Sequence, residues 1–335
     1  MLRCAAMVIG TMWLFGCGRG PSGPSVVVYT SVDQVYSEPI LRHFEASTGI
    51  KVLAVYDVEA AKTTGLVNRL IAEASRPRAD VFWNGEFAQT LVLGERGVLA
   101  PYRSPAAHGL PAAYLDSAGR WTGLGGRARV LLVNTKLVAQ EDFPHSIFDL
   151  LDDRWPARRI GIANPLFGTS CTQAAALYSA LGAGRAREFY RRLVARGVRV
   201  LDGNSVVRDL VGSGELMIGW TDSDDACGAI LRGDPVSVVI PDPDSLGTLI
   251  IPGTAALVAG APHPQEGRRL LDFLLGAEAE KRLVEGGFSQ WAPRDPSVRP
   301  GCLTLGQMKP LQAALADIQR FVPQAQAELR EIFLR

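Results

Sequence analysis

The stretch VVVYTSVD, residues 26–33, decides the fold. Its first four residues form a β-branched and aromatic run, which predicts a strand buried on both faces. The polar residues that follow can cap a helix in which Ile40, Leu41 and Phe44 share one face, and Gly49 ends that helix. A buried strand followed directly by an amphipathic helix is the repeating unit of a parallel α/β sheet.

The same alternation continues over most of the chain. Further buried strands are predicted at residues 51–58, 79–83, 129–134, 159–163, 216–220, 236–240 and 249–258. Helical patterns lie near residues 62–74, 173–181, 185–196, 205–211 and 224–231, and the chain from Pro264 onward is mostly helical, with a long last segment over residues 306–335. We therefore predict an α/β fold with helices on both faces of parallel sheets. In such sheets ligands bind at the carboxyl ends of the strands.

Composition places the chain among ordinary globular proteins. Of its 335 residues, 47% are hydrophobic and 21% are charged, which is enough for two lobes with a core each. The net charge is +1 and there is no run of lysine and arginine. Charge therefore gives no reason to expect nucleic acid as a partner.

The first residues have the pattern of an export signal. Arg3 precedes an apolar stretch over residues 5–15, which is too short to span a bilayer but suits a signal peptide. The sequence Leu-Phe-Gly-Cys at residues 14–17 has the form of a lipobox. We predict a lipoprotein signal over residues 1–17, a lipid anchor on Cys17 and a Gly/Pro/Ser tether over residues 18–25, with the lipid as the only membrane attachment. The alternative is a plain cleaved signal in which Cys17 has no role.

Polar side chains gather where predicted strands end, and these are the candidate ligand-binding residues. They are Ser31, Asp33, Gln34, Glu86, Arg127, Thr169, Ser170, Asp222, Asp224 and Asp225.

Two clusters of these residues lie at the starts of predicted helices. Three carboxylates occur in four residues at 222–225, where one would be enough to cap a helix. The excess indicates a site for a cation or an amine. Thr169 and Ser170 also begin a helix, where hydroxyl and backbone N–H groups either form a simple cap or hold an anion. Two glycines ahead of Arg127 would let a ligand approach it closely, although a surface role for that side chain stays open.

Known catalytic motifs are missing from the sequence. It contains no G-x-S-x-G, no P-loop and no H-E-x-x-H. We therefore predict a binding protein rather than an enzyme. A hydrolase that uses the carboxylates of the same cleft is the alternative from another class.

Several short motifs, in this order, resemble those of one family. They are Val28-Tyr29-Thr30-Ser31, Phe44-Glu45 with Thr48-Gly49-Ile50-Lys51-Val52, Ala79-Asp80-Val81-Phe82-Trp83, Gly126-Arg127 with Arg129-Val130, Gly214-Glu215, and Ala277-Glu278-Ala279-Glu280-Lys281. The chain resembles the type II periplasmic solute-binding proteins of ABC importers, in particular the ferric-ion-binding family. The resemblance implies two lobes, each a mostly parallel sheet flanked by helices, that close on a ligand about a hinge. Lobe one would comprise residues 25–125 plus 252–299, and lobe two residues 126–251 plus 300–335.

The resemblance also implies roles for the candidate residues. The family's anion-binding arginine falls on Arg127, and its anion-holding turn falls on Thr169 and Ser170. Its lobe-one carboxylate ligand falls on Glu86, and its first-strand histidine falls near Asp33 or Gln34. The tandem tyrosines that hold ferric iron fall on Asp224 and Asp225, so the phenolate ligands are missing.

Several ligands therefore stay open. Glu86, Asp224 and Asp225 are candidate metal ligands, because carboxylates are hard oxygen donors. Ferric iron with a synergistic anion and a phosphonate or amine-type solute both fit the polar residues. An apolar cargo such as a lipid is a further alternative. In each case the bound species would be the transported ligand, and no cofactor is required. The implied partner is the membrane permease of an ABC importer, and the protein would act as a monomer on the periplasmic side of the membrane or at the cell surface.

Three cysteines remain once the signal and the anchor are set aside. They are Cys171, Cys227 and Cys302, and an exported protein can form one disulfide from them. Cys171 and Cys227 each follow one of the implied ligand loops of lobe two. We therefore predict a Cys171–Cys227 disulfide behind the site.

Overall fold

The computed structural model describes residues 23–57, 63–290, 292–295, 297–302 and 308–334. The predicted signal over residues 1–17, the anchor on Cys17 and most of the predicted tether lie outside the described residues. Among the helices described, none combines the length and the apolar character needed to cross a membrane.

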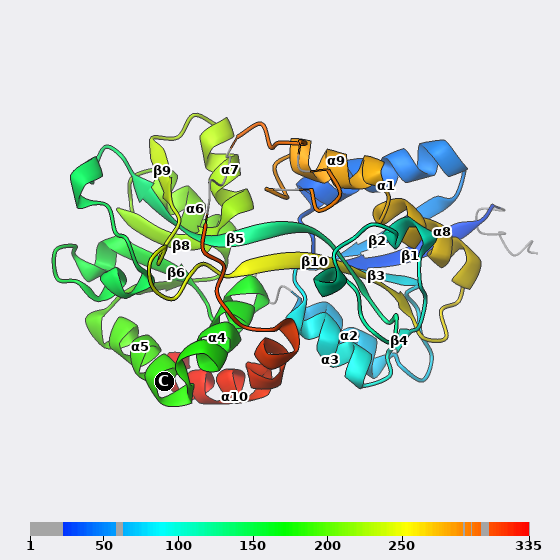
Figure 1. Cartoon of the computed structure of the whole chain (residues 1–335), viewed down its shortest axis with the longest axis horizontal. Helices are drawn as coiled ribbons and strands as arrows, with labels where there is room; N and C mark the ends of the chain where they lie inside the picture. The colour runs from blue at the N-terminus through cyan, green and yellow to red at the C-terminus, as the bar shows by residue number, and fades with distance from the viewer. Residues whose placement is uncertain (1–22, 58–62, 291, 296, 303–307, 335) are drawn as a thin grey trace, which may run out of the picture.

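Two long antiparallel strands run through the middle of the molecule and connect its two lobes (Figure 1). They are β5 (Thr122–Asn134), which is buried along its whole length, and β10 (Ile250–Val258). The register places Ala255 opposite Thr122 at one end and Ile250 opposite Ala128 at the other, with a bulge between Ile251 and Gly253. The strand order through both lobes is β2-β1-β3-β10-β5-β8-β6-β7.

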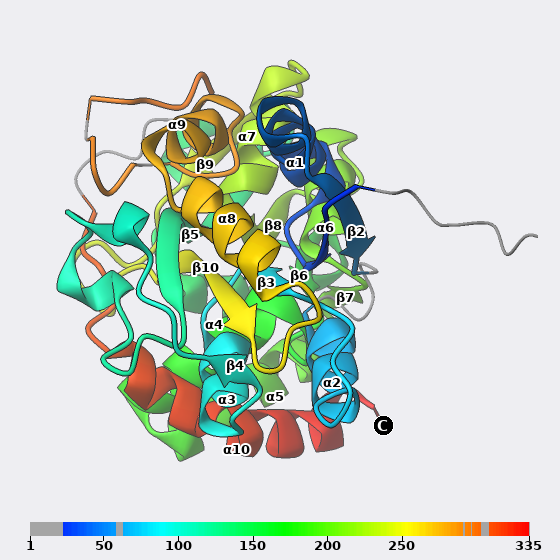
Figure 2. The same cartoon turned by 90° about the vertical axis from the view of Figure 1, so that its right-hand side faces the viewer.

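Lobe one is a sheet between two layers of helices. Its elements are β1 (Ser25–Thr30), α1 (Gln34–Thr48), β2 (Lys51–Tyr56), α2 (Thr64–Ala72), β3 (Val81–Asn84), α3 (Ala88–Glu95), β4 (Leu99–Ala100), α8 (Pro264–Leu274) and α9 (Ala277–Glu285). Strand β1 lies between β2 and β3 and is parallel to both, which explains its apolar sequence. Helices α1, α8 and α9 cover one face of the sheet, and α2 and α3 cover the other (Figure 2).

Lobe two repeats this plan at the other end of the long strands. Its elements are β6 (Ile160–Ala163), α4 (Gly168–Leu181), α5 (Ala183–Arg196), β7 (Arg199–Leu201), α6 (Asn204–Gly212), β8 (Ile218–Asp222), α7 (Ser223–Leu231), β9 (Val236–Val239) and α10 (Leu315–Phe333). Helix α10 packs mainly on α4 and α5 and also reaches α3 of lobe one, where the amide of Gln319 donates to Glu95 over 2.9 Å.

The predicted α/β fold is confirmed, with one difference in the sheet. Strands that belong to β–α units pair in parallel, namely β1 with β2 and β3, and β6 with β7 and β8. Every pair that involves β5 or β10 is antiparallel. The sheet is therefore mixed, because the chain crosses between the lobes in both directions on these two strands. The residue boundaries given above for the lobes remain a prediction. The last helix starts at Leu315, later than the expected position 306.

The predicted Cys171–Cys227 disulfide is wrong. Cys227 is bonded to Cys302, with their Cα atoms 5.2 Å apart, and Cys171 is a free, buried thiol. The side chain of Cys171 lies in the core between α4 and α10, whereas Cys227 on α7 faces the segment that follows α9. Sequence spacing does not reveal which side of each helix faces its neighbours.

Candidate functional site

A small cavity of about 30 Å³ lies between the two lobes. Lobe one contributes the ends of β1 and β3 to its wall, β5 contributes Arg127, and lobe two contributes the ends of its strands and the starts of its helices. Eight of the predicted site residues line this cavity: Ser31, Asp33, Glu86, Arg127, Thr169, Ser170, Asp222 and Asp225.

Two predicted residues lie elsewhere. Gln34 is exposed on the first turn of α1, where its amide donates to Glu38 over 2.9 Å. Asp224 is buried beside the cavity, and one of its oxygens accepts a hydrogen bond of 2.8 Å from Arg127. The expectation that Gln34 belongs to the binding site therefore finds no support in its position.

Two helices of lobe two point their N-terminal ends at the cavity. Residues 167–170 at the start of α4 and residues 202–204 at the start of α6 are part of its wall. In the described part of the chain, neither helix has a side-chain cap hydrogen bond at its N-cap residue. The hydroxyl of Ser170 is buried and has no hydrogen-bond partner among the described residues. First-turn N–H groups and helix dipoles favour a negative charge at such a place.

Asp222, the N-cap residue of α7, is fixed by a dense set of donors. Arg129 donates to one carboxylate oxygen over 2.7 Å, and Thr169 donates to the other over 2.6 Å. Asn204 and Arg127 add longer hydrogen bonds of 3.2 and 3.4 Å. Burial alone would raise the pKa of Asp222, but the two guanidinium groups outweigh it and hold the pKa below its ordinary value. Asp222 is therefore ionised at neutral pH.

The next two carboxylates are in a less favourable environment. Burial raises the pKa of Asp224 to about 6 despite the neighbouring Arg127, and repulsion from Asp222 and Asp33 adds to the effect. Burial and repulsion, first from Asp224 and then from Asp222 and Asp33, raise the pKa of Asp225 well above its ordinary value. Oδ1 of Asp224 is buried with no hydrogen-bond partner among the described residues. Buried carboxylates that lack full compensation are favourable sites for a cationic group.

Glu86 has a different environment, although it also lies at a helix start. Its carboxylate accepts hydrogen bonds from the backbone N–H groups of Ala88 and Gln89, from the amide of Asn84 and, over 2.7 Å, from the hydroxyl of Thr172 in lobe two. It therefore caps α3 and connects the two lobes. Burial nevertheless raises its pKa.

The guanidinium of Arg127 already has partners within the protein. Its guanidinium donates to Asp224 and Asp222 and to the backbone carbonyl of Gly85, and its plane lies 4.8 Å from the ring centre of Phe288. Its charge is balanced mainly by carboxylates, so an anion bound at α4 would depend chiefly on the helix starts and Ser170.

Some residues of the cavity wall were not singled out from the sequence. Asp202, Gly203 and Asn204 follow β7 and begin α6, so a polar run at a strand end was an available signal. Arg129 lies within a buried strand, and only its position in the fold brings it to Asp222.

The carboxylate oxygens of Asp222, Asp224 and Asp225 lie within 4.8 Å of one another, a spacing compatible with a metal ion. Most of these oxygens already accept hydrogen bonds. Both oxygens of Asp222 are bonded, and Asp225 accepts from Arg208 over 3.2 Å and from Thr221 over 3.3 Å. Three arginines in direct contact with the cluster, Arg127, Arg129 and Arg208, oppose a highly charged metal ion electrostatically. The donor set therefore suits a hydrogen-bonding cation better than a trivalent ion.

The cavity wall is polar, which bears on the apolar alternative. Among the described residues that line it, Phe167 is the only large apolar side chain, and leucine and tryptophan are absent. Sites for apolar molecules are lined mainly by hydrophobic side chains. An apolar cargo does not fit this cavity.

The sequence profile of one family, the bacterial extracellular solute-binding proteins, matches residues 25–289. The chain belongs to this family. The match covers both lobes and the two strands that connect them. The family's members bind solutes, in agreement with a cavity enclosed by two lobes.

Individual relatives of this solute-binding protein are distant but extend along most of its length. Iron uptake protein A1 of Synechocystis sp. is 25% identical over 303 residues, which are 84% of this chain and 82% of that protein. A Salmonella paratyphi A protein whose name points to 2-aminoethylphosphonate binding in the periplasm is 26% identical over 320 residues, 92% of this chain and 90% of that protein.

The fold of a solved relative agrees as well. The periplasmic binding protein AfuA of Actinobacillus pleuropneumoniae, solved with fructose-6-phosphate, superposes with a TM-score of 0.82 at 20% identity. The superposition covers 93% of this chain and 99% of that one. The two-lobed fold predicted from the sequence is thereby confirmed.

Proposed function

We propose that this solute-binding protein captures a small zwitterion, with an amine at one end and a phosphonate or phosphate at the other, and delivers it to the permease of an ABC importer. The observation that carries the proposal is the polarity of the cavity, with carboxylates on one side and two uncapped helix starts on the other.

The amine end is assigned to the carboxylate side. Asp33, Asp222 and Asp225 line the cavity there, and burial with repulsion from Asp224 raises the pKa of Asp225 although Arg208 is bonded to it, so a further cation would stabilise its charge. A primary ammonium donates three hydrogen bonds and can share oxygens that already accept one. It therefore needs less rearrangement of the cluster than a metal ion.

The anionic end is assigned to the start of α4. Ser170 offers a buried hydroxyl that has no partner among the described residues, and the first turns of α4 and α6 present N–H groups toward the same space. The name of the Salmonella relative and the sugar phosphate bound by AfuA support a phosphorus-containing anion as the ligand class.

We further propose that the protein binds without turnover, as a monomer attached to the outer side of the membrane through lipid on Cys17. Replacing Cys17 by alanine should then move the exported protein from the membrane fraction to the soluble fraction. The carboxylate hydrolase remains the competing proposal, and phosphorus NMR of a ligand recovered after incubation separates the two, because a binding protein returns it unchanged.

Calorimetric titration tests the ligand class. We expect 2-aminoethylphosphonate to bind, and ethylphosphonate and ethanolamine, which lack one charged end each, to bind at least about tenfold more weakly. Ser170→Ala should weaken 2-aminoethylphosphonate binding about fivefold, because one hydrogen bond is lost. Binding of ferric citrate with no binding of any phosphonate would replace this proposal by the metal-ion alternative.

A further inference from the structure

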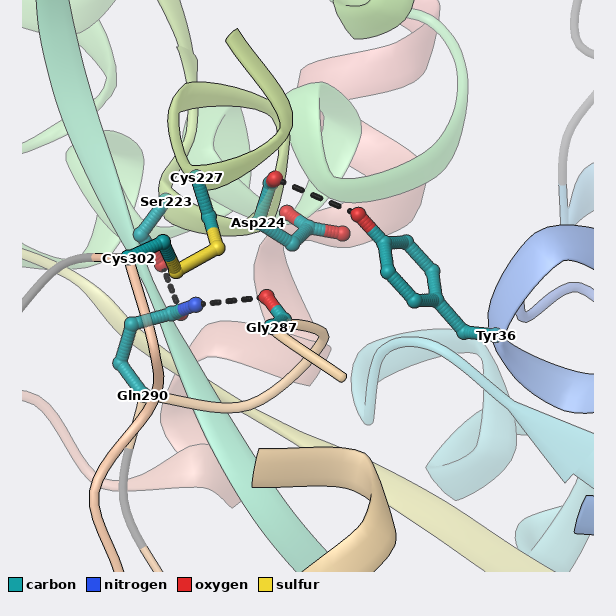
Figure 3. The surroundings of a disulfide bond; sticks show 7 residues. All are labelled: Tyr36, Ser223, Asp224, Cys227, Gly287, Gln290 and Cys302. Carbon is teal, nitrogen blue, oxygen red and sulfur yellow. Dashed lines mark hydrogen bonds between the residues drawn. A yellow bond between two sulfur atoms is a disulfide. The ribbon is translucent and has the colours of Figure 1, made fainter. Parts of the chain in front are cut away.

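The Cys227–Cys302 disulfide joins two parts of the chain that meet beside the binding site (Figure 3). Cys227 lies on α7 of lobe two, one turn after the acidic residues 222–225. Cys302 lies in the stretch that leaves lobe one after α9 and leads to α10 in lobe two. We call the described residues of this stretch between Gly286 and Cys302 the crossing segment.

The start of the crossing segment packs directly against the disulfide. A side chain at Gly287 would meet the sulfur of Cys227 at 2.4 Å, so only a glycine fits there. The carbonyl of Gly287 accepts a hydrogen bond of 2.9 Å from the amide of Gln290, and the amide oxygen of Gln290 accepts one from the hydroxyl of Ser223. Ser223 is the first residue of α7. The crossing segment therefore contacts α7 at Ser223, the first residue of the helix, and at Cys227, one turn later.

The crossing segment also contacts residues at the place where the two lobes meet. The hydroxyl of Ser289 accepts a hydrogen bond of 2.7 Å from the backbone N–H of Gly126, next to Arg127. The ring of Phe288 lies under the guanidinium of Arg127 and 5.5 Å from the ring of Tyr36 on α1. Tyr36 in turn reaches across to lobe two, where its hydroxyl donates to the backbone carbonyl of Asp224 over 3.4 Å (Figure 3).

We propose that the Cys227–Cys302 disulfide is a strap that holds the acidic first turn of α7 against the lobe boundary and so favours the closed, solute-binding arrangement of the lobes. Only the identity of the solute used below rests on the proposed function.

The physical reason is that the bond links α7 covalently to the crossing segment. Without it, α7 would be held to residues 287–290 by the hydrogen bond between Ser223 and Gln290 and by packing at Gly287, and it could separate from them when lobe two rotates away. A cross-link removes much of that freedom. If the strap raises the fraction of molecules with closed lobes, the apparent affinity for the solute rises by the same factor.

The experiment compares the full exported chain with a variant that carries Cys227→Ala and Cys302→Ser. Alanine suits the fully buried position and serine the half-buried one. Small-angle scattering of the solute-free proteins measures lobe opening, and calorimetry with 2-aminoethylphosphonate measures affinity. We expect a larger radius of gyration for the solute-free variant and an affinity about three- to tenfold weaker. Saturating solute should return the variant to the radius of the wild type.

A matched control separates opening from general destabilisation. Leu70→Ala removes a buried side chain of α2 from the core on the other face of the lobe-one sheet, a cluster that includes no residue of α7 or of the crossing segment, and lowers stability without touching the strap. Its solute-free radius and its affinity should equal those of the wild type at a temperature where all three proteins are folded. If the double variant does not fold, the same measurements on folded wild type before and after reduction with a phosphine take its place.

Identical scattering of the solute-free wild type and the strap variant, or of wild type before and after complete reduction, would overturn the strap. This readout needs no solute, so it stands even if 2-aminoethylphosphonate fails to bind. That failure would overturn the proposed ligand alone.

Discussion

Glu86 and Asp224 are buried carboxylates at helix starts, yet they are bonded in different ways. Glu86 accepts hydrogen bonds from two first-turn N–H groups of α3 and from two side chains. At α7, no side-chain cap hydrogen bond forms at Asp222 within the described structure, and Asp224 keeps an oxygen without a partner. One carboxylate stabilises the protein, and the other group is available for a ligand.

The difference shows that position on a helix does not decide the role of a carboxylate. A residue that caps its own helix has its charge compensated by the fold. A buried carboxylate with an oxygen that lacks a donor gains from a cation, whereas a raised pKa does not separate the two cases, because burial raises that of Glu86 as well. The predictions below test this contrast.

The largest effect is expected for stability at Glu86. Glu86→Ala leaves donors on α3, Asn84 and Thr172 without their acceptor, so the free energy of unfolding should fall by about 3 kcal/mol. Urea denaturation measures it. Glu86→Gln, which keeps part of the acceptor capacity, should lose about half as much. An unchanged midpoint for the alanine variant would contradict the structural role.

The second-largest effect is expected for ligand affinity when Asp225 on α7 is replaced. Asp225→Asn should weaken 2-aminoethylphosphonate binding about tenfold, because the amine loses an ionic partner. The free energy of unfolding should stay the same or rise, since a buried, repelled charge is removed. Calorimetry and urea denaturation together check both halves. Loss of stability without loss of affinity would assign to Asp225 the role of Glu86.

The pH dependence of ligand affinity tests whether the carboxylates of α7 bind the amine. The pKa of Asp224 is raised to about 6, and that of Asp225 is raised as well. Since the amine binds the ionised forms, affinity should fall as the pH drops through about 6, and binding near that pH should release protons. Calorimetry in buffers of different ionisation enthalpy measures this release. A flat profile between about pH 5 and 8 would contradict it.

As the pH drops, ligand affinity should fall, whereas the free energy of unfolding of the solute-free protein should rise. A carboxyl with a raised pKa in the folded state binds its proton more tightly there than in the unfolded chain. The contribution of Asp224 to stability therefore increases as the pH falls through about 6 toward its ordinary value. Asp222, whose pKa is lowered, opposes this only below about pH 4. Asp224→Asn should remove the part of the pH dependence near pH 6.

The smallest effect is expected at Gln34. This side chain is exposed and away from the cavity, so Gln34→Ala should change both affinity and the free energy of unfolding by less than about 0.5 kcal/mol. The variant is also the surface control for the Asp225 measurements. A clear loss of affinity would restore Gln34 to the site.

Sequence patterns predicted the fold better than the details of the site. Alternating apolar strands and helices predict the α/β class, and the strand predicted at residues 249–258 is β10, which pairs with β3 of lobe one. The acidic run and the Thr169–Ser170 pair were found because strand ends of such sheets gather at one place. Gln34 was included in the same way, but it points to solvent because it begins the exposed side of α1.

Hydrophobic periodicity and strand-end polarity are local signals, so the sequence alone determined the fold class and eight of the residues around the cavity. Only the tertiary structure decided how they are bonded. It saturates Glu86 with donors, pairs Arg127 with Asp224, leaves Ser170 without a partner, and joins Cys227 to Cys302 rather than to Cys171. Each of these outcomes depends on groups far apart in the chain, and their distance and direction are set by packing between elements.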